Sequence, residues 1–453
     1  MSKQTKQNNK MLEQPVPSLL VSMSVPMMLS MVVQALYNIV DSMFVARLGV
    51  QALTAVSYIF PLQSLVLSLA VGFGVGINAV IAMNLGMGNQ EKANQAATLG
   101  MALTVLHGLL FVVLGVAVPR PFLQLFTDDG QVMQWGCQYA SIVFIFSMGY
   151  LLQISMEKIF QSVGEMLTTM VLLASGCIMN IILDPILIFG WFGVPAMGVA
   201  GAAVATVLGQ TVAFFLYVLA YRRKKLAVQI HPRYCKWSGQ IVWKLYYIGI
   251  PAAITMALPS VLSGGLNKLV SAYGDVYVAV LGIYFKLQTF LYMPSNGIIQ
   301  GMRPILSCNY GAGRRDRLWQ TIACSIGAVL AIMLLGTLLC WLLPEPIMRL
   351  FDDDTQLLAI GVQALPVISM GFVLSAAGVV TCGVLEALGR GIASLCLSLL
   401  RQFVLTVPLA WWLIGHLGVD AVWMALPIAE GAAFLFALFL LWRLWREAGP
   451  RAE

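Results

Sequence analysis

The sequence predicts an all-α integral membrane protein with twelve transmembrane helices, arranged as two pseudo-symmetric six-helix lobes around a central cleft. Three observations support this prediction. The 453-residue chain is 60% hydrophobic and only 10% charged, whereas soluble domains carry roughly 25% charged residues. Apolar runs long enough to cross a bilayer recur along it. Residues of the first half also reappear in the second half at one constant offset.

The expected helices are apolar runs of about 20 residues, the length that a helix needs to cross the hydrocarbon core. Lipid offers no partner to backbone polar groups, so runs of this length must be helical. The expected spans, with ends soft by several residues, are 16–40, 53–80, 95–118, 133–156, 166–190, 197–220, 242–271, 276–302, 319–343, 358–382, 391–415 and 419–443. Six of them fall in each half of the chain.

An offset of 225 residues relates the two halves, and Pro26 returns as Pro251. The glycines Gly72, Gly76, Gly86 and Gly88 return as Gly297, Gly301, Gly311 and Gly313. Because six spans separate equivalent positions, both halves enter the membrane in the same orientation. This predicts a pseudo-two-fold axis along the membrane normal, with a cleft between the lobes. The glycines are expected to let helices approach closely, and the prolines to bend their helices.

The basic residues predict the orientation of the chain. Lys and Arg cluster before span 1, between spans 6 and 7, between spans 8 and 9 and after span 12, all on one side. Of the 26 Lys and Arg residues, only Arg47, Arg120 and Arg349 fall in loops on the other side. By the positive-inside rule, both termini lie in the cytoplasm and the protein lies in the cell membrane. The net charge of +7 therefore reflects topology and predicts no nucleic-acid partner.

The polar linker between spans 6 and 7 is the expected domain boundary. The predicted division is 1–15 as a cytoplasmic tail, 16–220 as the N-lobe, 221–241 as a cytoplasmic linker, 242–443 as the C-lobe and 444–453 as a second cytoplasmic tail. The eight cysteines are scattered, which fits buried apolar residues and neither a disulfide framework nor a metal site. We expect no cofactor, and a working monomer because no dimerisation motif is present.

Two carboxylates inside apolar runs are the sharpest functional signal. An Asp at the centre of a membrane helix costs roughly 3 kcal/mol on insertion scales, so it is rarely kept there without a role. Asp41 follows Tyr37 by four residues in span 1, so the two share a helix face. Asp184 follows Asn180 by four residues in span 5 and shares a face with it in the same way. An alternative stays open, in which Asp41 caps a helix end and Asp184 starts a turn at Pro185.

If these faces meet, carboxylate, amide and phenol oxygens surround a small wet cavity in one lobe. Such hard oxygens suit Na⁺, and since burial disfavours an ionised carboxyl they also suit a proton. The repeat places Leu266 opposite Asp41 and Leu262 opposite Tyr37, and no acid lies near 406–408, opposite Asp184. We therefore expect the cation site in the N-terminal lobe alone, with the choice between H⁺ and Na⁺ left open.

The C-terminal half instead carries charges of both signs in or near its spans. They are Lys268, Lys286, Arg303, Glu386, Arg401 and Glu430. We expect Lys286 and Arg303 to pair with an acid or to extend toward the interface. The sequence leaves open whether any of these residues contacts a substrate.

Three runs of sequence resemble signatures of the MATE (multidrug and toxic compound extrusion) transporters. YNIVDSMFVARLG at 37–49 resembles the signature of the first span, and NIILDP at 180–185 that of the fifth. MPSNG, QGMRPI and NYGA within 293–312 look like the signature of the eighth span. The resemblance covers essentially the whole chain. It implies a twelve-helix, two-lobed antiporter that expels organic cations in exchange for H⁺ or Na⁺.

The resemblance also implies site residues. A cation site, with Na⁺ as one candidate ion, would lie at positions matching Asp41, Asn180 and Asp184. Tyr37 is a neighbour, and Thr206 matches a span-6 threonine of the family site. Candidates for the substrate cleft are Gln34, Asn38, Gln288, Met293 and Arg303. Some branches carry a further acid in span 7, but this chain has no carboxylate in that span before Asp275, which favours a mechanism based in the N-lobe.

The expected function is a secondary active multidrug antiporter that exports lipophilic organic cations by alternating access. The alternative is a flippase for a lipid or a lipid-linked sugar, which is disfavoured because few cations are expected beside the cleft and the N-lobe is acidic. An enzyme is not expected, since the spans contain no HExxH, DDxxD or Ser/His/Asp grouping. An ATP-driven pump is not expected either, because the chain contains no Walker motif.

Overall fold

The computed structural model describes residues 10–351 and 353–447, and these residues form helices with no strand among them. Helices of the first half are α2 (Val16–Ala46), α3 (Val50–Gly86), α4 (Gln90–Ala117), α5 (Pro119–Leu123), α6 (Gly130–Ile145), α7 (Ser147–Ser162), α8 (Met166–Phe189) and α9 (Val199–Arg223). Those of the second half are α10 (Gly239–Val270), α11 (Asp275–Gly311), α12 (Arg315–Leu342), α13 (Pro344–Arg349), α14 (Thr355–Ala387), α15 (Gly391–Leu399), α16 (Thr406–Leu417) and α17 (Val422–Glu447). Short turns η1 to η5 connect or interrupt them at Trp191–Gly193, Pro232–Tyr234, Ser271–Tyr273, Leu400–Val404 and Val419–Ala421.

The number of membrane spans agrees with the prediction. Among the described residues, eleven helical segments are long and apolar enough to cross a bilayer, and the bent pair α6–α7 supplies a twelfth. The central apolar helices are longer than expected, since α3 and α11 each run for 37 residues. These two helices reach well beyond a single hydrocarbon core, so their ends extend into the loops and carry the repeated glycines.

Two expected spans are not regular helices. The fourth, expected as one helix over 133–156, breaks at Phe146 with a bend of 47° between α6 and α7, and α7 continues to Ser162. The eleventh contains a turn of π-helix, η4, at Leu400–Val404 between α15 and α16. Hydropathy records only how apolar a run is, so neither interruption could be read from it. Both lie beside the cavities described below.

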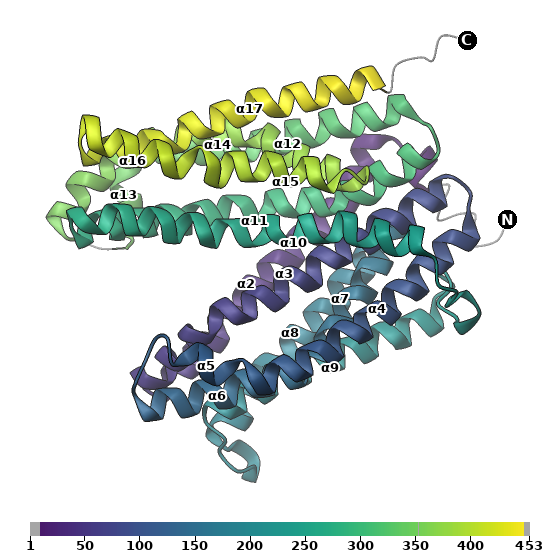
Figure 1. The fold of residues 1–453 in the computed structure, drawn as a ribbon, viewed down its shortest axis with the longest axis horizontal. Coiled ribbons are helices and arrows are strands. Elements are labelled where there is room, and N and C mark those ends of the chain that lie inside the picture. Colours follow the sequence, from purple (N-terminus) through teal and green to yellow (C-terminus); the bar gives the residue numbers. More distant parts are fainter. Residues whose placement is uncertain (1–9, 352, 448–453) are drawn as a thin grey trace.

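The helices form two groups that diverge like the arms of a V (Figure 1). The first half of the chain makes one arm and the second half makes the other. The arms converge at the end where both termini lie, and they separate toward α5, α6, α13 and α16. At the convergent end α3 packs along α10, and α2 packs along α11. The two lobes are therefore in contact on the side of the termini and spread apart toward the opposite side.

The repeated glycines allow helices of the two lobes to pack closely at the convergent end. A Cβ atom on Gly72 would lie 2.5 Å from the backbone nitrogen of Ala253, and one on Gly301 would lie 2.6 Å from Ser24 Oγ. Near the termini, a Cβ on Gly86 would overlap the carbonyl oxygen of Cys308, and its repeat mate Gly311 stands in the same relation to Met83. The predicted packing role is confirmed for these glycines, which lie between the lobes rather than between helices of one lobe. It is not confirmed for Gly88 and Gly313, where a Cβ atom would meet nothing within 4 Å and the positive φ angle is the reason for glycine.

Loops near the termini strengthen this closure. Arg317 Nη2 donates to the carbonyl oxygen of Gln14 at 2.7 Å, which ties the start of the chain to α12. In the linker, the backbone N–H of Gln229 donates to Asn94 Oδ1 at 2.8 Å. The predicted boundaries at 15, 220, 241 and 443 and the cytoplasmic placement of the termini stay predictions. The residues Lys3, Lys6, Asp352 and Arg451 lie outside the described ranges.

Candidate functional site

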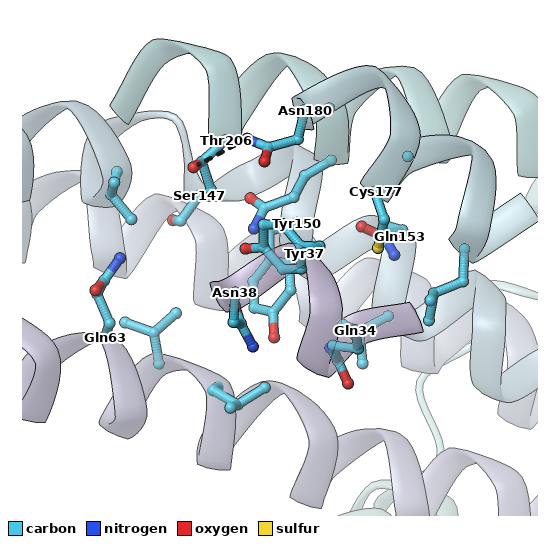
Figure 2. A pocket seen from close by; sticks show the side chains of 18 of the residues that line it. Gln34, Tyr37, Asn38, Gln63, Ser147, Tyr150, Gln153, Cys177, Asn180 and Thr206 are labelled. Atoms are coloured by element: carbon cyan, nitrogen blue, oxygen red, sulfur yellow. Dashed lines mark hydrogen bonds between the residues drawn. The ribbon is translucent and has the colours of Figure 1, made fainter. Parts of the chain in front are cut away.

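A polar cavity of about 280 Å³ lies inside the N-lobe, among helices α2, α3, α6, α7, α8 and α9. Side chains from these helices converge on it, as Figure 2 shows. Its polar wall consists of Gln34, Tyr37, Asn38, Gln63, Ser64, Ser147, Tyr150, Gln153, Cys177, Asn180, Thr206 and Gln210. The structure thus brings together five of the predicted residues from three helices: Gln34, Tyr37 and Asn38 from α2, Asn180 from α8 and Thr206 from α9.

Asn180 is the hub that connects the predicted residues of α8 and α9. Its side-chain nitrogen lies 3.4 Å from Asp184 Oδ1 and 3.3 Å from Thr206 Oγ1. With the amide turned over, that nitrogen donates to Asp184 Oδ2 at 3.2 Å, and its oxygen accepts from the backbone N–H of Thr206 at 3.1 Å. In either orientation Asn180 bridges Asp184 and Thr206. Asp184 is completely buried behind this bridge.

Asp41 is the second carboxylate, and it stands beside the same group of residues. It is half-buried on α2, and its Oδ1 atom is shielded from solvent without a hydrogen-bond partner among the described residues. Asp41 and Asp184 lie within electrostatic range of each other, and Tyr139 lies within range of both. Neither carboxylate pairs with a described Lys, Arg or His. Among the described residues, no cationic side chain is therefore available to balance an ionised Asp41 or Asp184.

The alternative interpretation of the two carboxylates is wrong. Helix α2 continues past Asp41 to Ala46, so Asp41 caps no helix end. Helix α8 continues through Pro185 to Phe189, so Asp184 starts no turn. Both carboxylates therefore lie inside transmembrane helices, although neither is in the cavity wall itself.

The C-lobe has no such group at the repeated positions. Leu262 and Leu266, opposite Tyr37 and Asp41 at the 225-residue offset, are both buried in the apolar core of the C-lobe. The predicted asymmetry of the two lobes therefore extends from the sequence to the packing.

A second cavity, of about 370 Å³, lies between the lobes, and we call it the central cleft. Its walls come from α2, α3, α7 and α8 on one side and from α10, α11, α14, α15 and η4 on the other. Four residues line both this cleft and the N-lobe cavity, namely Gln34, Leu67, Ile154 and Leu173. The two spaces therefore adjoin, and a molecule in the cleft is next to the cavity that holds Asn180.

The cleft contains a buried ion pair that the sequence analysis missed. Glu157 and Lys158 are adjacent on α7, and their charged atoms lie 3.1 Å apart with only 6% and 4% of the side chains exposed. Lys158 Nζ also contacts the side-chain oxygen of Gln161 at 3.0 Å and that of Gln300, across the cleft, at 3.2 Å. Span 4 was expected to end at residue 156 because two adjacent charges interrupt the apolar run. The charges instead compensate each other, so the helix continues.

The charged side chains of the C-lobe make different kinds of contact. Arg303 Nη2 donates to Glu386 Oε2 at 2.5 Å, which confirms the expected pairing of Arg303, and Ser394 donates to the other carboxylate oxygen at 3.2 Å. Lys286 lies over the ring of Phe351, 5.6 Å from its centre. Arg401 and Glu430 approach to 3.5 Å. Lys268 lies apart, in a surface pocket beside Trp411.

Three cations line the cleft, namely Lys158, Arg303 and Arg401. Of the substrate-cleft candidates, Gln34, Asn38 and Arg303 line one or both cavities. Gln288 and Met293 line neither of the two cavities, and their role stays a prediction. Gln288 faces its own helix, where its amide donates to the Tyr284 hydroxyl at 2.9 Å.

Chemically, the N-lobe group offers two carboxylates with neutral oxygens of Asn180, Thr206 and Tyr37 nearby. The shielded, unpartnered oxygen of Asp41 is a place for a proton or a small monovalent cation. The described residues contain no cluster of three His, Cys, Asp or Glu side chains suited to a metal ion.

Twelve apolar spans in two similar lobes, with ionisable groups buried between and within them, define a polytopic membrane transporter. The MatE family model matches residues 26–186 and 251–412, once in each half. The chain therefore belongs to the MatE family. The two matches begin at Pro26 and Pro251, which is the 225-residue repeat found in the sequence.

Known relatives cover nearly the whole chain. A probable multidrug resistance protein, YoeA of Bacillus subtilis, is 29% identical over 94% of this chain and 93% of its own length. The multidrug export protein MepA of Staphylococcus haemolyticus is 24% identical over 93% of this chain and 92% of its own. The structure also resembles an outward-facing multidrug resistance MATE family transporter of the MOP superfamily. The TM-score is 0.90 at 24% identity, over 98% of this chain and 99% of that one.

Proposed function

We propose that this transporter is a secondary antiporter that exports lipophilic organic cations in exchange for H⁺ or Na⁺ by alternating access. The observation that best supports this is the unoccupied negative charge of the N-lobe. Asp41 and Asp184 lie near each other without a paired cation among the described residues. They lie next to a cavity of the N-lobe, and this cavity adjoins the central cleft between the two lobes. An exchangeable ion and a cationic substrate can both use that charge, but not together.

The transport cycle follows from this competition. We propose that the convergent end with the termini faces the cytoplasm, so that the described conformation is open to the outside. An external ion binds at Asp41 and Asp184, neutralises them and releases the cationic substrate outward. The lobes then rock to open toward the cytoplasm, where the ion leaves and another substrate binds. Ion and substrate are coupled because each favours a different state, and by linkage each weakens the binding of the other.

The roles of individual residues follow from their positions. Asn180 and Thr206 hold Asp184 in place, and Tyr37 offers a phenol oxygen at the cavity wall. Gln34 and Asn38 contact a substrate that enters from the cleft. Multidrug transport is supported by the names of the two relatives, which are a multidrug export protein and a probable multidrug resistance protein. We propose that the working unit is a monomer.

A flippase is less well supported. The cleft holds three cations, but each has a carboxylate partner within 3.5 Å. A cleft with balanced charge gives no strongly cationic surface for a phosphate group. Resistance of expressing cells to ethidium and quaternary ammonium compounds would support the antiporter, and unchanged sensitivity would favour the flippase.

The proposed function is tested by dye efflux from reconstituted vesicles under two imposed gradients. We expect one gradient, of H⁺ or of Na⁺, to drive ethidium transport, and Asp41→Asn to lose that response. Asp128→Asn, a change in an exposed loop, is the matched control and should transport like the wild type. Transport by the wild type that ignores both gradients would contradict antiport.

A further inference from the structure

The C-lobe wall of the central cleft carries a polar cluster with no assigned role. Arg401 and Gln402 both line the cleft, and both lie in the π-helical turn η4 at Leu400–Val404. Single turns of π-helix inside α-helices are frequently found at functional sites. Here the turn interrupts a transmembrane helix at the point where that helix faces the other lobe. The interruption therefore indicates that this wall of the cleft has a functional role in addition to packing.

The cluster has unused hydrogen-bonding capacity. The guanidinium of Arg401 is shielded, with 11% of the side chain exposed, yet its Nε and Nη1 atoms have no hydrogen-bond acceptor among the described residues. Glu430 is its ion-pair partner, but the closest approach of 3.5 Å is too long for a good hydrogen bond. The side-chain oxygen of Gln402 is likewise buried without a donor. Leaving buried polar atoms unpaired is costly, so such a group commonly waits for a ligand.

The other two cleft cations differ from Arg401. Lys158 donates to Glu157, Gln161 and Gln300, and Arg303 makes a 2.5 Å hydrogen bond to Glu386. The Arg401 guanidinium makes an ion contact and lies 5.8 Å from the ring centre of Tyr292, and its Nε and Nη1 atoms have no acceptor in the part of the chain that the structure describes. Of the three, it is the one with most of its donors free.

Resting on the proposed function, we propose that Arg401 binds the carboxylate of a zwitterionic substrate. The planar fork of a guanidinium matches a carboxylate with two parallel N–H···O bonds. The cationic group of such a molecule lies in the cleft, which adjoins the N-lobe cavity through Gln34. The role assigned to Arg401 is to hold the carboxylate of the substrate.

Two dyes that differ by one methyl group test this proposal. Rhodamine B carries a xanthylium cation and a free carboxylate, and its methyl ester keeps the cation alone. Equilibrium binding is measured by fluorescence polarisation with the full-length protein in nanodiscs. The test variant is the double substitution Arg401→Gln/Glu430→Gln, which removes both charges and leaves none unpaired. The control is Arg443→Gln, whose exposed ion pair lies outside the cleft.

We expect the double variant to bind the acid about tenfold or more weakly, as the loss of charge-assisted hydrogen bonds implies. Its affinity for the ester should change less than about threefold, and the control should match the wild type for both dyes. Equal weakening for acid and ester, or no change for either, would overturn the proposal while the antiporter stands. Displacement of the acid by short-chain phosphatidic acid would overturn the small-molecule assignment in favour of a lipid phosphate. A wild type that binds neither dye would contradict the proposed function and this inference with it.

Discussion

The two lobes share one scaffold but treat charge in opposite ways. In the N-lobe, Asp41 and Asp184 are carboxylates without a paired cation among the described residues. In the C-lobe, the carboxylate of Glu430 stands 3.5 Å from the guanidinium of Arg401. At the 225-residue offset Arg401 corresponds to Gly176, which lines the N-lobe cavity. The N-lobe carboxylates can therefore bind a cation from solution, whereas the C-lobe carboxylate of Glu430 is paired with Arg401 of the same lobe.

This difference separates movement from coupling. The elements that both lobes keep are the glycines at their interface and the prolines inside α2 and α10. These allow two similar bodies to pack and rock. The buried ionisable residues, in contrast, are not repeated: Asp41 has Leu266 at the 225-residue offset, and Arg401 has Gly176. A duplicated chain can thus preserve the machinery of motion in both copies while one copy alone binds the exchangeable ion.

The largest expected effect follows from Asp184→Asn. Efflux driven by the ion gradient should fall to the level of protein-free vesicles, because a neutral amide cannot exchange a cation. Stability should be equal or higher, since a fully buried carboxylate without a cationic partner is replaced by a neutral isostere. Vesicle efflux and thermal unfolding in detergent measure the two quantities on one preparation. Loss of transport together with a large loss of stability would show that Asp184 is structural.

The C-lobe should respond in the reverse manner. Glu430→Gln leaves the Arg401 guanidinium without the one ion-pair partner that it has among the described residues, which typically costs about 3 kcal/mol of stability. Arg401→Gln/Glu430→Gln removes both charges and should recover most of that loss. Thermal unfolding of the single and double variants makes the comparison. If the single and double variants unfold alike, the charges do not compensate each other.

A smaller effect is expected at the interface that both lobes share. Gly86→Ala and Gly311→Ala place a methyl group against a backbone carbonyl of the other lobe. Overpacking of ~1–3 kcal/mol should shift the population about tenfold or more toward the state that opens on the side of the termini. Spin labels at Val50→Cys and Tyr273→Cys, in a cysteine-free background, should report a shorter distance across the open end.

The control for this experiment is Gly327→Ala, where a Cβ atom meets nothing within 4 Å. Because Gly86 and Gly311 are repeat mates, the two substitutions should shift the distance by similar amounts. A shift for one and none for the other would mean that the interface is less symmetric than the glycine contacts indicate.

Much of the fold could be predicted from sequence because each part depends on local composition. Continuous apolar runs identify membrane helices, and the constant offset identifies the two lobes. The bend at Phe146 and the π-helical turn at Arg401 were missed, since neither changes the hydropathy of the run that contains it. The convergence of the lobes on one side depends on contacts between distant helices, which a single sequence does not display.

The candidate site was partly predictable for a related reason. Asp41 and Asp184 stand out because a lone acid in an apolar run is costly. Glu157 and Lys158 were not predicted, because two adjacent charges end an apolar run in the sequence. In the structure the two side chains form an ion pair, so both can be buried. Gln288 was predicted to face the cleft, but its amide is used by Tyr284 one turn away.

The central claim is that the N-lobe carboxylates hold an ion that competes with the substrate. Its most direct test is the Kd for ethidium, measured as the concentration of the coupling ion is raised, for the wild type, Asp128→Asn and Asp41→Asn. We predict that the Kd of the first two rises with the ion concentration, because the ion and the dye need the same charge. The Kd of Asp41→Asn should stay flat. An equally steep rise in Asp41→Asn would show that the competing ion binds elsewhere.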